Sequence, residues 1–596
     1  MRKFLLATIF LLPALFSFGQ APADPRLKGL DTLVARVLRE WHAPGVAIAV
    51  VEKNKLVYAG GFGYRDVEKK LPVTQHTLFA IGSCTKAFTA SMLGMLVKDG
   101  KIDIDKPVRN YLPELKFYND YLNDHVTLRD MMCHRTGLPR HDLSWYGSSA
   151  SRSELLERIQ YMEPSAELRE KWQYNNFMFM AQGVVVEKIT GKSWEENMTE
   201  RIFGPLGMSE TVMNIDGMEK SGDHSLAYSL KNDSVIIAIP YRNIDAVGPA
   251  GSVNSSATDM SKWLITWING GKFNGKEVIP PGYITQASTE QMPTGGGYPQ
   301  KENPDVFFSG YGFGWGMSSY RGHYRVEHGG GIDGFISSTG FFPTDSIGIF
   351  VVSDQGGPTS SIRNFIADRM LKLSYKNWSK YLLDLDKKAK ATAKATPKTD
   401  SLNRKPDTKP SHPLKDYAGE YKNGGYGKIE VKVHEDSLLA DFNSFHLLLK
   451  HYHYDQFNAM PIGPGYDDAE PFKFSFHLDA KGDVEKLTAP MEGGVKDIEF
   501  VKELKAISVA RADLEKYTGE YELSSVTVKV YIKNDTTLMV LVPGQPDYEL
   551  VPVKKDEFNL KVMSGYSVRF TVNGNENASE LYFVQPNGTF KATRKK

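Results

Sequence analysis

Hydrophobic positions near the start of the chain predict one helix and then two strands. Apolar side chains recur every three or four positions from Leu30 to Trp41, which is the spacing of a helix with one buried face. Two apolar runs follow at 45–51 and 56–62, joined by the polar residues 53–55. This pattern is typical of two adjacent antiparallel strands.

The middle of the chain is mostly helical by the same criterion, and β-type patterns return after residue 226. We expect helices at 88–99, 128–134, 152–162, 175–190, 258–268 and 360–383, and strands within 226–240 and 307–353. A block of helices between two ends that build an antiparallel sheet predicts an α+β fold, with the sheet flanked by helices and a helical insert domain.

The composition changes sharply between residues 386 and 410. The stretch 387–398 consists of Lys, Ala, Thr and Pro, so it has no bulky apolar side chain with which to build a core. We interpret 386–410 as an extended linker. The alternative is a basic tract that binds an anionic surface.

An internal repeat follows this linker. The segment Leu414–Tyr421 recurs as Leu514–Tyr521, 100 residues later, with the shared pattern Tyr-x-Gly-x-Tyr. Alternating polar and apolar runs follow each copy, and the spacing fits a small domain rather than a solenoid repeat. We therefore predict two antiparallel β domains, small barrels or sandwiches, at 411–506 and 507–596.

The N-terminus has the pattern of a secretory signal. Arg2 and Lys3 precede an apolar run at 4–16 and small residues near position 19. The run is too short to span a bilayer comfortably, which disfavours the alternative of a membrane anchor. We expect a cleaved signal peptide at 1–19, a first domain at 20–385, and a periplasmic or secreted protein.

Charge and cysteine content exclude several classes of function. The chain has 72 basic and 71 acidic residues, a net charge of +1, and shows no nucleic-acid footprint. Its two cysteines, Cys84 and Cys133, indicate neither a disulfide framework nor a metal site. They either pair with each other or are buried as small hydrophobic residues.

Ser83 and Lys86 stand between a short apolar segment, 77–81, and a predicted buried helix. At positions i and i+3 on a helix, the two side chains lie within hydrogen-bonding reach. A serine becomes a nucleophile when a neighbouring base takes its proton, and a buried lysine near a helix N-terminus has the lowered pKa that this base needs. The alternative is an ordinary surface serine, because the short pattern also occurs by chance.

A phenol and an amide lie close together in the sequence at Tyr174 and Asn176, in a predicted turn before a helix. If the tyrosine is buried near a lysine, the cation favours phenolate and lowers the pKa of the phenol. The phenolate would then accept the proton of the serine and pass it to a leaving group. The alternative is an ordinary buried tyrosine in a turn.

His328 is followed by Gly329, Gly330 and Gly331, next to a β-type run. On an edge strand, such glycines let a substrate backbone approach closely, and their N–H groups can hold an oxyanion. The alternative is a flexible glycine turn. His134, at a predicted helix end, is interpreted as structural.

The ordered motifs Ser83-x-x-Lys86, Tyr174-x-Asn176 and His328-x-Gly330 resemble those of the serine β-lactamase and penicillin-binding-protein superfamily. The nearest branch by this resemblance is the class C β-lactamase-like group, with D-aminopeptidases, D-Ala-D-Ala carboxypeptidases and family VIII-type esterases. The resemblance covers roughly 27–375, and further stretches support it: 134–139, 202–208 and 248–252.

The resemblance implies a role for each motif residue. Ser83 is the nucleophile, Lys86 deprotonates it or relays its proton, and Tyr174 is the general base and later the general acid. Asn176 orients Lys86 and binds a substrate carbonyl. The N–H groups of Ser83 and Gly331 form the oxyanion hole, and His328 and Gly330 belong to the substrate-binding strand. No metal or cofactor is implied.

One departure from the family pattern bears on the substrate. The third motif of β-lactamases usually begins with Lys-Thr-Gly, where this chain has His328-Gly329-Gly330. Histidine is largely neutral near pH 7, and glycine lacks the hydroxyl that would bind a substrate carboxylate. The pattern therefore favours an esterase or a peptidase over an efficient β-lactamase.

Three functional hypotheses follow. The leading one is an exported serine hydrolase that acts through an acyl-enzyme on a peptide, ester or amide, including cell-wall fragments. The second is a penicillin-binding or sensor-type protein with little turnover. The third assigns a ligand-binding or protein-binding role to the tandem β domains, which resemble the lipocalin-like domains of some relatives and offer a surface for oligomer formation.

Overall fold

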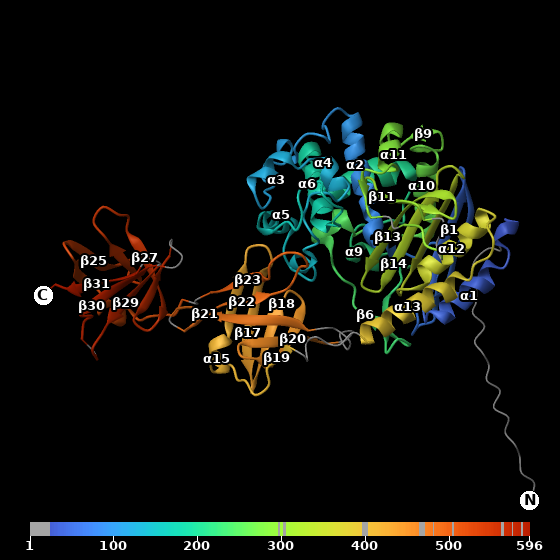
Figure 1. The fold of residues 1–596 in the computed structure, drawn as a ribbon. Coiled ribbons are helices and arrows are strands. Elements are labelled where there is room, and N and C mark those ends of the chain that lie inside the picture. Colours follow the sequence, from blue (N-terminus) through green and yellow to red (C-terminus); the bar gives the residue numbers. More distant parts are fainter. Residues whose placement is uncertain are drawn as a thin grey trace, which may run out of the picture. The chain divides into compact units, whose positions relative to one another are not determined.

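The computed structural model describes residues 24–295, 298–301, 306–395, 403–463, 471–480, 482–503, 506–561, 566–574, 576–585 and 588–595. The predicted signal peptide at 1–19 and part of the predicted linker, 396–402, lie outside these residues. The chain divides into two compact units, 1–501 and 502–596. Figure 1 shows the elements of both units.

A nine-stranded antiparallel sheet organises the described part of the first domain, in the order β10-β11-β12-β13-β14-β15-β1-β2-β3. Its strands are β1 (Gly45–Glu52), β2 (Lys55–Asp66), β3 (Leu71–Pro72), β10 (Met292–Pro293), β11 (Ser309–Tyr311), β12 (Gly316–Tyr320), β13 (His323–Ile332), β14 (Phe335–Phe342) and β15 (Ile347–Ser353). The predicted hairpin is β1–β2. Pairing of β1 with β15 joins the two ends of the domain.

Both faces of the sheet are covered by helices, which explains why β1 is apolar at nearly every position. Val46, Ile48 and Val50 pack with α1 (Leu30–Glu40) and α12 (Pro358–Met370). Ala47, Ala49 and Val51 belong to the core on the opposite face, with α2 (Thr85–Lys98) and α10 (Ala257–Ile268). Successive side chains of a strand point to opposite faces, so burial on both sides requires a continuous apolar run.

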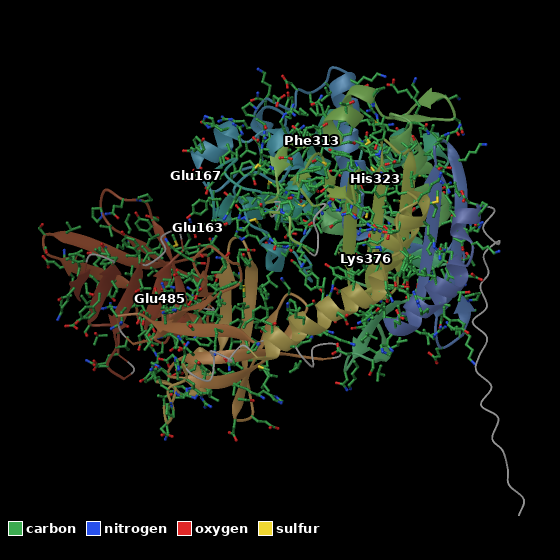
Figure 2. All side chains as sticks on the ribbon, turned by 45° about the vertical axis from the view of Figure 1, so that its right-hand side comes forward. Glu163, Glu167, Phe313, His323, Lys376 and Glu485 are labelled. Atoms are coloured by element: carbon green, nitrogen blue, oxygen red, sulfur yellow. The ribbon has the colours of Figure 1, made fainter. Side chains whose placement is uncertain are left out.

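The helical insert follows β2 and β3 in the chain. Its helices include α3 (Asp120–His125), α4 (Leu128–Met132), α5 (Arg152–Arg158), α6 (Asn176–Thr190), α7 (Trp194–Met198), α8 (Gly204–Leu206) and α9 (Ile215–Lys220). Capping boxes begin α4 at Thr127 and α5 at Ser151. Figure 2 shows how densely side chains fill the space between the helices and the sheet, where Phe313 is fully buried.

The helix expected at 360–383 is in fact two helices, and the second continues into the predicted linker. After α12, α13 runs from Trp378 to Ala395. The interpretation of 386–395 as extended chain is therefore wrong. Lysine and alanine are good helix formers, and the first proline after this stretch is Pro397. The ion pairs Lys380–Asp384 and Lys390–Asp386 add support at the i,i+4 spacing.

The two predicted β domains are closed antiparallel barrels rather than sandwiches. The first contains β16 (Gly419–Asn423), β17 (Gly427–His434), β18 (Ser437–Phe442), β19 (Phe445–His453), β20 (Gln456–Ile462), β21 (Phe472–Leu478), β22 (Val484–Ala489) and β23 (Ile498–Glu503). The second contains β24 (Gly519–Leu523), β25 (Val526–Lys533), β26 (Thr537–Leu541), β27 (Tyr548–Lys554), β28 (Glu557–Leu560), β29 (Ser567–Thr571), β30 (Glu580–Gln585) and β31 (Gly588–Arg594).

The sequence repeat marks the same structural device in both barrels. The hydroxyl of Tyr421 donates to the carbonyl of Tyr417 at 2.7 Å, and that of Tyr521 donates to the carbonyl of Tyr517 at 2.8 Å. These tyrosines are buried in apolar cores. Each barrel interior is therefore filled by its own side chains, as expected for barrels of this size.

The tryptophans give a specific probe of the first domain, because all eight lie between Trp41 and Trp378. Phe88 is fully buried and stacks on Trp263 with 3.8 Å between ring centroids. We expect Phe88→Ala to lower the free energy of unfolding by about 3–5 kcal/mol, measured as urea denaturation followed by tryptophan fluorescence. Phe570→Ala, in the second barrel, is the control and should leave the midpoint of this fluorescence transition unchanged. An unchanged transition for Phe88→Ala would contradict the packing described.

Candidate active site

Ser83 and Lys86 lie where a short helix, η2 (Gly82–Cys84), leads into α2. Ser83 is partly exposed, whereas Lys86, one turn later, has no exposed surface. The Nζ atom of Lys86 is 3.0 Å from the Oγ atom of Ser83. The i, i+3 spacing therefore brings the two groups into direct contact.

Two carbonyl oxygens hold the Lys86 amine from the other side. It donates to Oδ1 of Asn176 and to the backbone carbonyl of Ala250, both at 2.7 Å. Aromatic rings close the remaining space, with Tyr174 at 4.7 Å and Phe179 at 5.5 Å from Nζ to the ring centroid. Burial lowers the pKa of Lys86 well below its usual value.

Tyr174 precedes α6 and is partly exposed, with its ring beside Lys86. Its ring centroid lies 4.4 Å from that of His134, and the guanidinium of Arg140 lies 4.9 Å from its centre. Burial raises the pKa of Tyr174, and a hydrogen bond with Ser83 offsets only part of this effect. The expectation of a lowered pKa is therefore wrong in direction, because removal from water outweighs nearby positive charge.

The amide of Asn176 is fixed at both ends. Asn175 caps α6, so Asn176 is the first residue of that helix. While its Oδ1 accepts from Lys86, its Nδ2 donates to Oδ1 of Asp142 at 2.9 Å. The same oxygen of Asp142 accepts from the indole of Trp145 at 2.8 Å.

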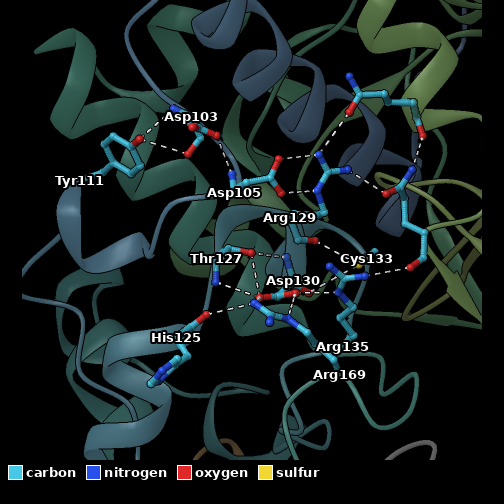
Figure 3. Close-up of polar contacts among 12 residues, drawn as sticks. Asp103, Asp105, Tyr111, His125, Thr127, Arg129, Asp130, Cys133, Arg135 and Arg169 are labelled. Atoms are coloured by element: carbon cyan, nitrogen blue, oxygen red, sulfur yellow. Dashed lines mark hydrogen bonds and ion pairs between the residues drawn. The ribbon is translucent and has the colours of Figure 1, made fainter.

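A buried carboxylate, that of Asp130, joins the loops that carry Arg135 and Arg169 (Figure 3). Asp130 has no exposed surface and accepts from the guanidinium groups of Arg135 and Arg169 at 2.6–2.9 Å. Backbone bonds then join the loops, from Arg169 N–H to Arg135 and from Gln173 N–H to His134. This network holds the segment that leads into Tyr174.

His134 occupies the structural position that the sequence suggested. It is fully buried, and its Nδ1 accepts from the backbone N–H of Asn175 at 3.1 Å. Burial lowers the pKa of its imidazole well below the usual value. The neutral ring therefore supports the residues that precede α6.

The glycine strand β13 is not an edge strand as expected, because it lies between β12 and β14. Its pairing with β12 nevertheless extends only from His323 to Glu327, whereas its pairing with β14 continues to Ile332. Residues 328–332 thus form a local edge within a central strand. In the described part of the chain, this short stretch has no strand paired on the β12 side, so it can admit a substrate backbone, as was predicted for an edge strand.

The glycines of this strand face different surroundings. A Cβ atom on Gly330 would lie 1.9 Å from the carbonyl oxygen of Ile81, so only glycine fits against the segment that leads into η2. Gly331 is exposed, and a Cβ atom there would be no closer than 3.3 Å to a neighbour, Ile336. Gly331 lines the same pocket as Ser83.

His328 lies behind the pocket wall. Its side chain is buried, with Nε2 2.8 Å from the hydroxyl of Tyr311 and Nδ1 2.6 Å from the carbonyl of Gly329. Burial, reinforced by Lys86, lowers the pKa of His328 to about 4. Neither His328 nor Gly330 is among the residues that line the pocket at Ser83, and their contact with substrate stays a prediction.

A pocket of about 400 Å³ opens at Ser83 and a second of about 470 Å³ opens at Tyr174. The first is lined by Gly82, Ser83, Arg140, Asp142, Trp145, Tyr146, Asn176, Ile244, Val247, Ala250, Gly251, Gly331, Ile332, Asp333 and Ile336. The second is lined by Pro139, Arg140, Trp172, Gln173, Tyr174, Glu492 and Gly493. Arg140 belongs to both.

Sequence reasoning missed the carbonyl of Ala250 and the carboxylate of Asp142. The first lies within the stretch 248–252, whose pattern was noted without a role. The second follows the stretch 134–139, with no local signal of its own. Both cysteines are buried free thiols, and Cys84 donates to the carbonyl of His328 at 3.2 Å.

The two glycines provide a matched pair of substitutions. We expect Gly330→Ala to lower the free energy of unfolding by about 1–3 kcal/mol, because the added methyl group forces β13 away from Ile81. Gly331→Ala should have a much smaller effect on stability. Urea denaturation followed by tryptophan fluorescence measures both. Equal losses in the two variants would contradict the close approach at Gly330.

Comparisons with known proteins agree with this architecture. A family model described as beta-lactamase matches residues 30–369, more than half of the chain. A second model, a domain of unknown function (DUF3471), matches 403–502, which contains nearly all of the first barrel.

Related proteins and solved structures extend the likeness. The chain is 29% identical over 436 residues to unguisins hydrolase ungD' of Aspergillus campestris, covering 69% of this chain and 79% of that protein. It is 26% identical over 506 residues to unguisins hydrolase ungD of Aspergillus violaceofuscus, covering 77% and 87%. The octameric penicillin-binding protein homologue from Pyrococcus abyssi has a similar fold, with a TM-score of 0.52 and 23% identity, over 79% of this chain and 99% of that one. The chain belongs to the beta-lactamase family, within the superfamily of serine β-lactamases and penicillin-binding proteins.

Proposed function

We propose that this protein is an exported serine hydrolase that forms an acyl-enzyme at Ser83 and releases it with water. The observation that carries the proposal is the position of the Lys86 amine, between two carbonyl oxygens and the hydroxyl of Ser83. A neutral amine has two N–H donors and one lone pair. With both donors on the carbonyls of Asn176 and Ala250, the lone pair faces Ser83.

This arrangement favours Lys86, rather than Tyr174, as the first acceptor of the serine proton. Burial lowers the pKa of Lys86, which makes the neutral amine accessible, and raises the pKa of Tyr174, which disfavours phenolate. We therefore propose Lys86, in place of Tyr174, as the initial base. As a protonated phenol that is hydrogen-bonded to Ser83, Tyr174 is suited to general acid catalysis.

The proposed cycle transfers each proton between neighbouring groups. Lys86 takes the proton of Ser83 as Oγ bonds to the substrate carbonyl carbon. Tyr174 protonates the leaving group as its bond to that carbon breaks, and the Lys86 ammonium returns a proton to Tyr174. Water then attacks the acyl carbon and gives a proton to Lys86. The Lys86 ammonium returns that proton to Oγ of Ser83 as the bond between Oγ and the acyl carbon breaks.

The N–H groups of Ser83 and Gly331 are the proposed oxyanion donors. Both residues line the same pocket, and Gly82 packs closely on the backbone of Gly331. The glycine at position 330 permits this approach, because it leaves room for Ile81. Removing one such donor in other enzymes costs about 10²–10³ in turnover.

A peptide, amide or ester is the substrate class that the site favours. The local edge at 328–332 suits an extended substrate backbone. At the position of the usual third-motif lysine, this chain has the buried His328, which is neutral at pH 7, so a permanent cation for a β-lactam carboxylate is missing there. Two relatives bear the name hydrolase. An acyl-enzyme route of this kind hydrolyses amide or ester bonds.

Export is part of the same proposal and rests on the sequence alone. The basic and apolar pattern of residues 1–19 predicts cleavage near Gly19. The described residues include no helix that is long and apolar enough to cross a membrane.

Labelling of Ser83 tests the acyl-enzyme route. We expect wild type to react with a fluorophosphonate and to turn over peptide or ester substrates steadily, with little stable labelling by a fluorescent penicillin. Ser83→Ala should lose the label and about 10⁴-fold or more of the hydrolysis, because the nucleophile is gone. Equal labelling of Ser83→Ala would refute the route. A penicillin label that accumulates without turnover would favour a sensor-type protein.

Different leaving groups separate the roles of Lys86 and Tyr174. Fluoride leaves a fluorophosphonate without protonation, whereas an amide nitrogen needs a proton. Lys86→Ala should therefore lose both labelling and amide hydrolysis, whereas Tyr174→Phe should keep most of the labelling and lose amide hydrolysis. Loss of labelling in Tyr174→Phe as complete as in Lys86→Ala would restore Tyr174 as the base.

The pH dependence of labelling provides the second readout. Since the neutral form of Lys86 is the base, the wild-type labelling rate should rise with pH through the pKa of Lys86 and then level off. Burial lowers that pKa, so the midpoint should lie well below that of an exposed lysine. A labelling rate that keeps rising until the pH at which an exposed lysine loses its proton would contradict the assignment.

A further inference from the structure

The segment Arg140–Tyr146, which we call the bridging loop, contacts the catalytic groups on one side. Its Asp142 accepts from Asn176, whose other end accepts from Lys86. Its Arg140 lies over the ring of Tyr174. The position of this loop therefore determines how Asn176 and, through it, Lys86 are held.

The other side of the bridging loop is seated on the first barrel. His141 is buried, with Nδ1 2.7 Å from the hydroxyl of Tyr426 and Nε2 3.0 Å from the carbonyl of Glu163, a residue labelled in Figure 2. Because Nε2 must donate to that carbonyl, Nδ1 accepts from Tyr426. The backbone N–H of His141 donates to the carboxylate of Glu492.

Further contacts extend along the whole loop. Ser144 donates to the carbonyl of Gly425, and Asn443 donates to the carbonyls of Leu143 and Tyr146 at 2.8 and 3.2 Å. The ring of Tyr146 stacks on Phe445 with 5.9 Å between centroids. Leu143 and Tyr146 pack against the apolar core of the barrel, so the loop is held by both polar and apolar contacts.

The backbone of the loop needs this support. His141 has a φ of 49°, in the left-handed region that non-glycine residues avoid. Such a conformation persists only where surrounding contacts determine it. The contacts available to His141 from the barrel are those of Tyr426 and Glu492.

The turns that make these contacts differ from the corresponding turns of the second barrel. Asn423 pairs with Gly427 in the first barrel, which leaves the turn 424–426, whereas Leu523 pairs with Val526 in the second. The turn that carries Tyr426 is thus one residue longer. Glu492 lies in the connection 490–497, whereas the strands β30 and β31 pair directly across Gln585 and Gly588.

We propose that the first barrel is a positioning element of the active site, which holds the bridging loop through Tyr426 and Glu492 so that Asp142 fixes Asn176 against Lys86. The turns of the first barrel that contact this loop differ from the corresponding turns of the second barrel, whereas both barrels have the core tyrosines of the repeat. The interior of the barrel is filled by its own side chains, so its outer turns are the parts available for a specific role. Tyr426 is a positioning residue.

The test compares two tyrosines of the same barrel in the full-length protein. Tyr426→Phe removes the hydroxyl that donates to His141, and Tyr421→Phe removes one that donates to the carbonyl of Tyr417, also at 2.7 Å. Both side chains are buried. Each variant therefore loses a buried hydroxyl, but only the hydroxyl of Tyr426 touches the bridging loop.

Two readouts are measured for each variant: the rate of fluorophosphonate labelling at Ser83 per folded protein, and the hydrogen exchange of residues 139–147. Tyr426→Phe should slow labelling by about three- to tenfold, the size of effect expected from one buried hydrogen bond, and should speed exchange in the loop. Tyr421→Phe should change labelling by less than about twofold and leave loop exchange as in wild type.

A double variant tests whether the effect passes through Asp142. If the barrel acts through this residue, adding Tyr426→Phe to Asp142→Ala, which removes the acceptor for Asn176, should slow labelling by much less than Tyr426→Phe does alone. Fully multiplicative effects, or identical behaviour of Tyr426→Phe and Tyr421→Phe in both readouts, would overturn the proposal. The labelling readout rests on the proposed function, whereas the exchange readout does not. If wild type fails to label, the acyl-enzyme route fails and the exchange result alone decides the role of the barrel.

Discussion

The buried amine of Lys86 is the constraint on which the site depends. An ammonium group without exposed surface is costly unless it is paired, and here the partners are neutral carbonyl oxygens of Asn176 and Ala250. The charge is therefore disfavoured, and this is the ground on which the amine is proposed as the base next to Ser83. Three segments far apart in the sequence must come together for this effect: α2, the start of α6 and the turn at Ala250.

The sheet and the insert each supply part of that environment. The sheet fixes β13 against η2, with Gly330 at the point of closest approach. The insert supplies Tyr174 and Asn176 on a segment tied down by Asp130, Arg135 and Arg169. Because β12 stops pairing at Glu327, the same central strand that supports Ser83 also presents a local edge to the pocket.

The two barrels show how one repeated sequence serves two contexts. Both keep the tyrosine pair of the repeat, since the hydroxyl of the second tyrosine satisfies a buried carbonyl of the first. The turns are less constrained by the core, so they differ. In the first barrel they contact the bridging loop, which also contacts Asn176 and Tyr174. This barrel, which lies outside the residues matched by the beta-lactamase family model, is therefore linked to the candidate active site.

The sequence by itself determined the features that depend on local spacing. The contact of Ser83 with Lys86 follows from one helical turn, the β1–β2 hairpin from alternating apolar runs, and the paired β domains from the repeat at Tyr421 and Tyr521. The family followed from motifs in a fixed order. Each of these features depends on residue patterns within short stretches of the chain.

Only the tertiary structure decided the rest, because burial and non-local partners set it. The pKa of Tyr174 rises rather than falls, since desolvation exceeds the effect of nearby cations. The carbonyl of Ala250 and the carboxylate of Asp142 act through contacts with residues distant in the sequence, which no local pattern records. The contact between the bridging loop and Tyr426 likewise joins residues that are far apart in the sequence. Local sequence therefore specifies which groups are present, and packing specifies their protonation and their partners.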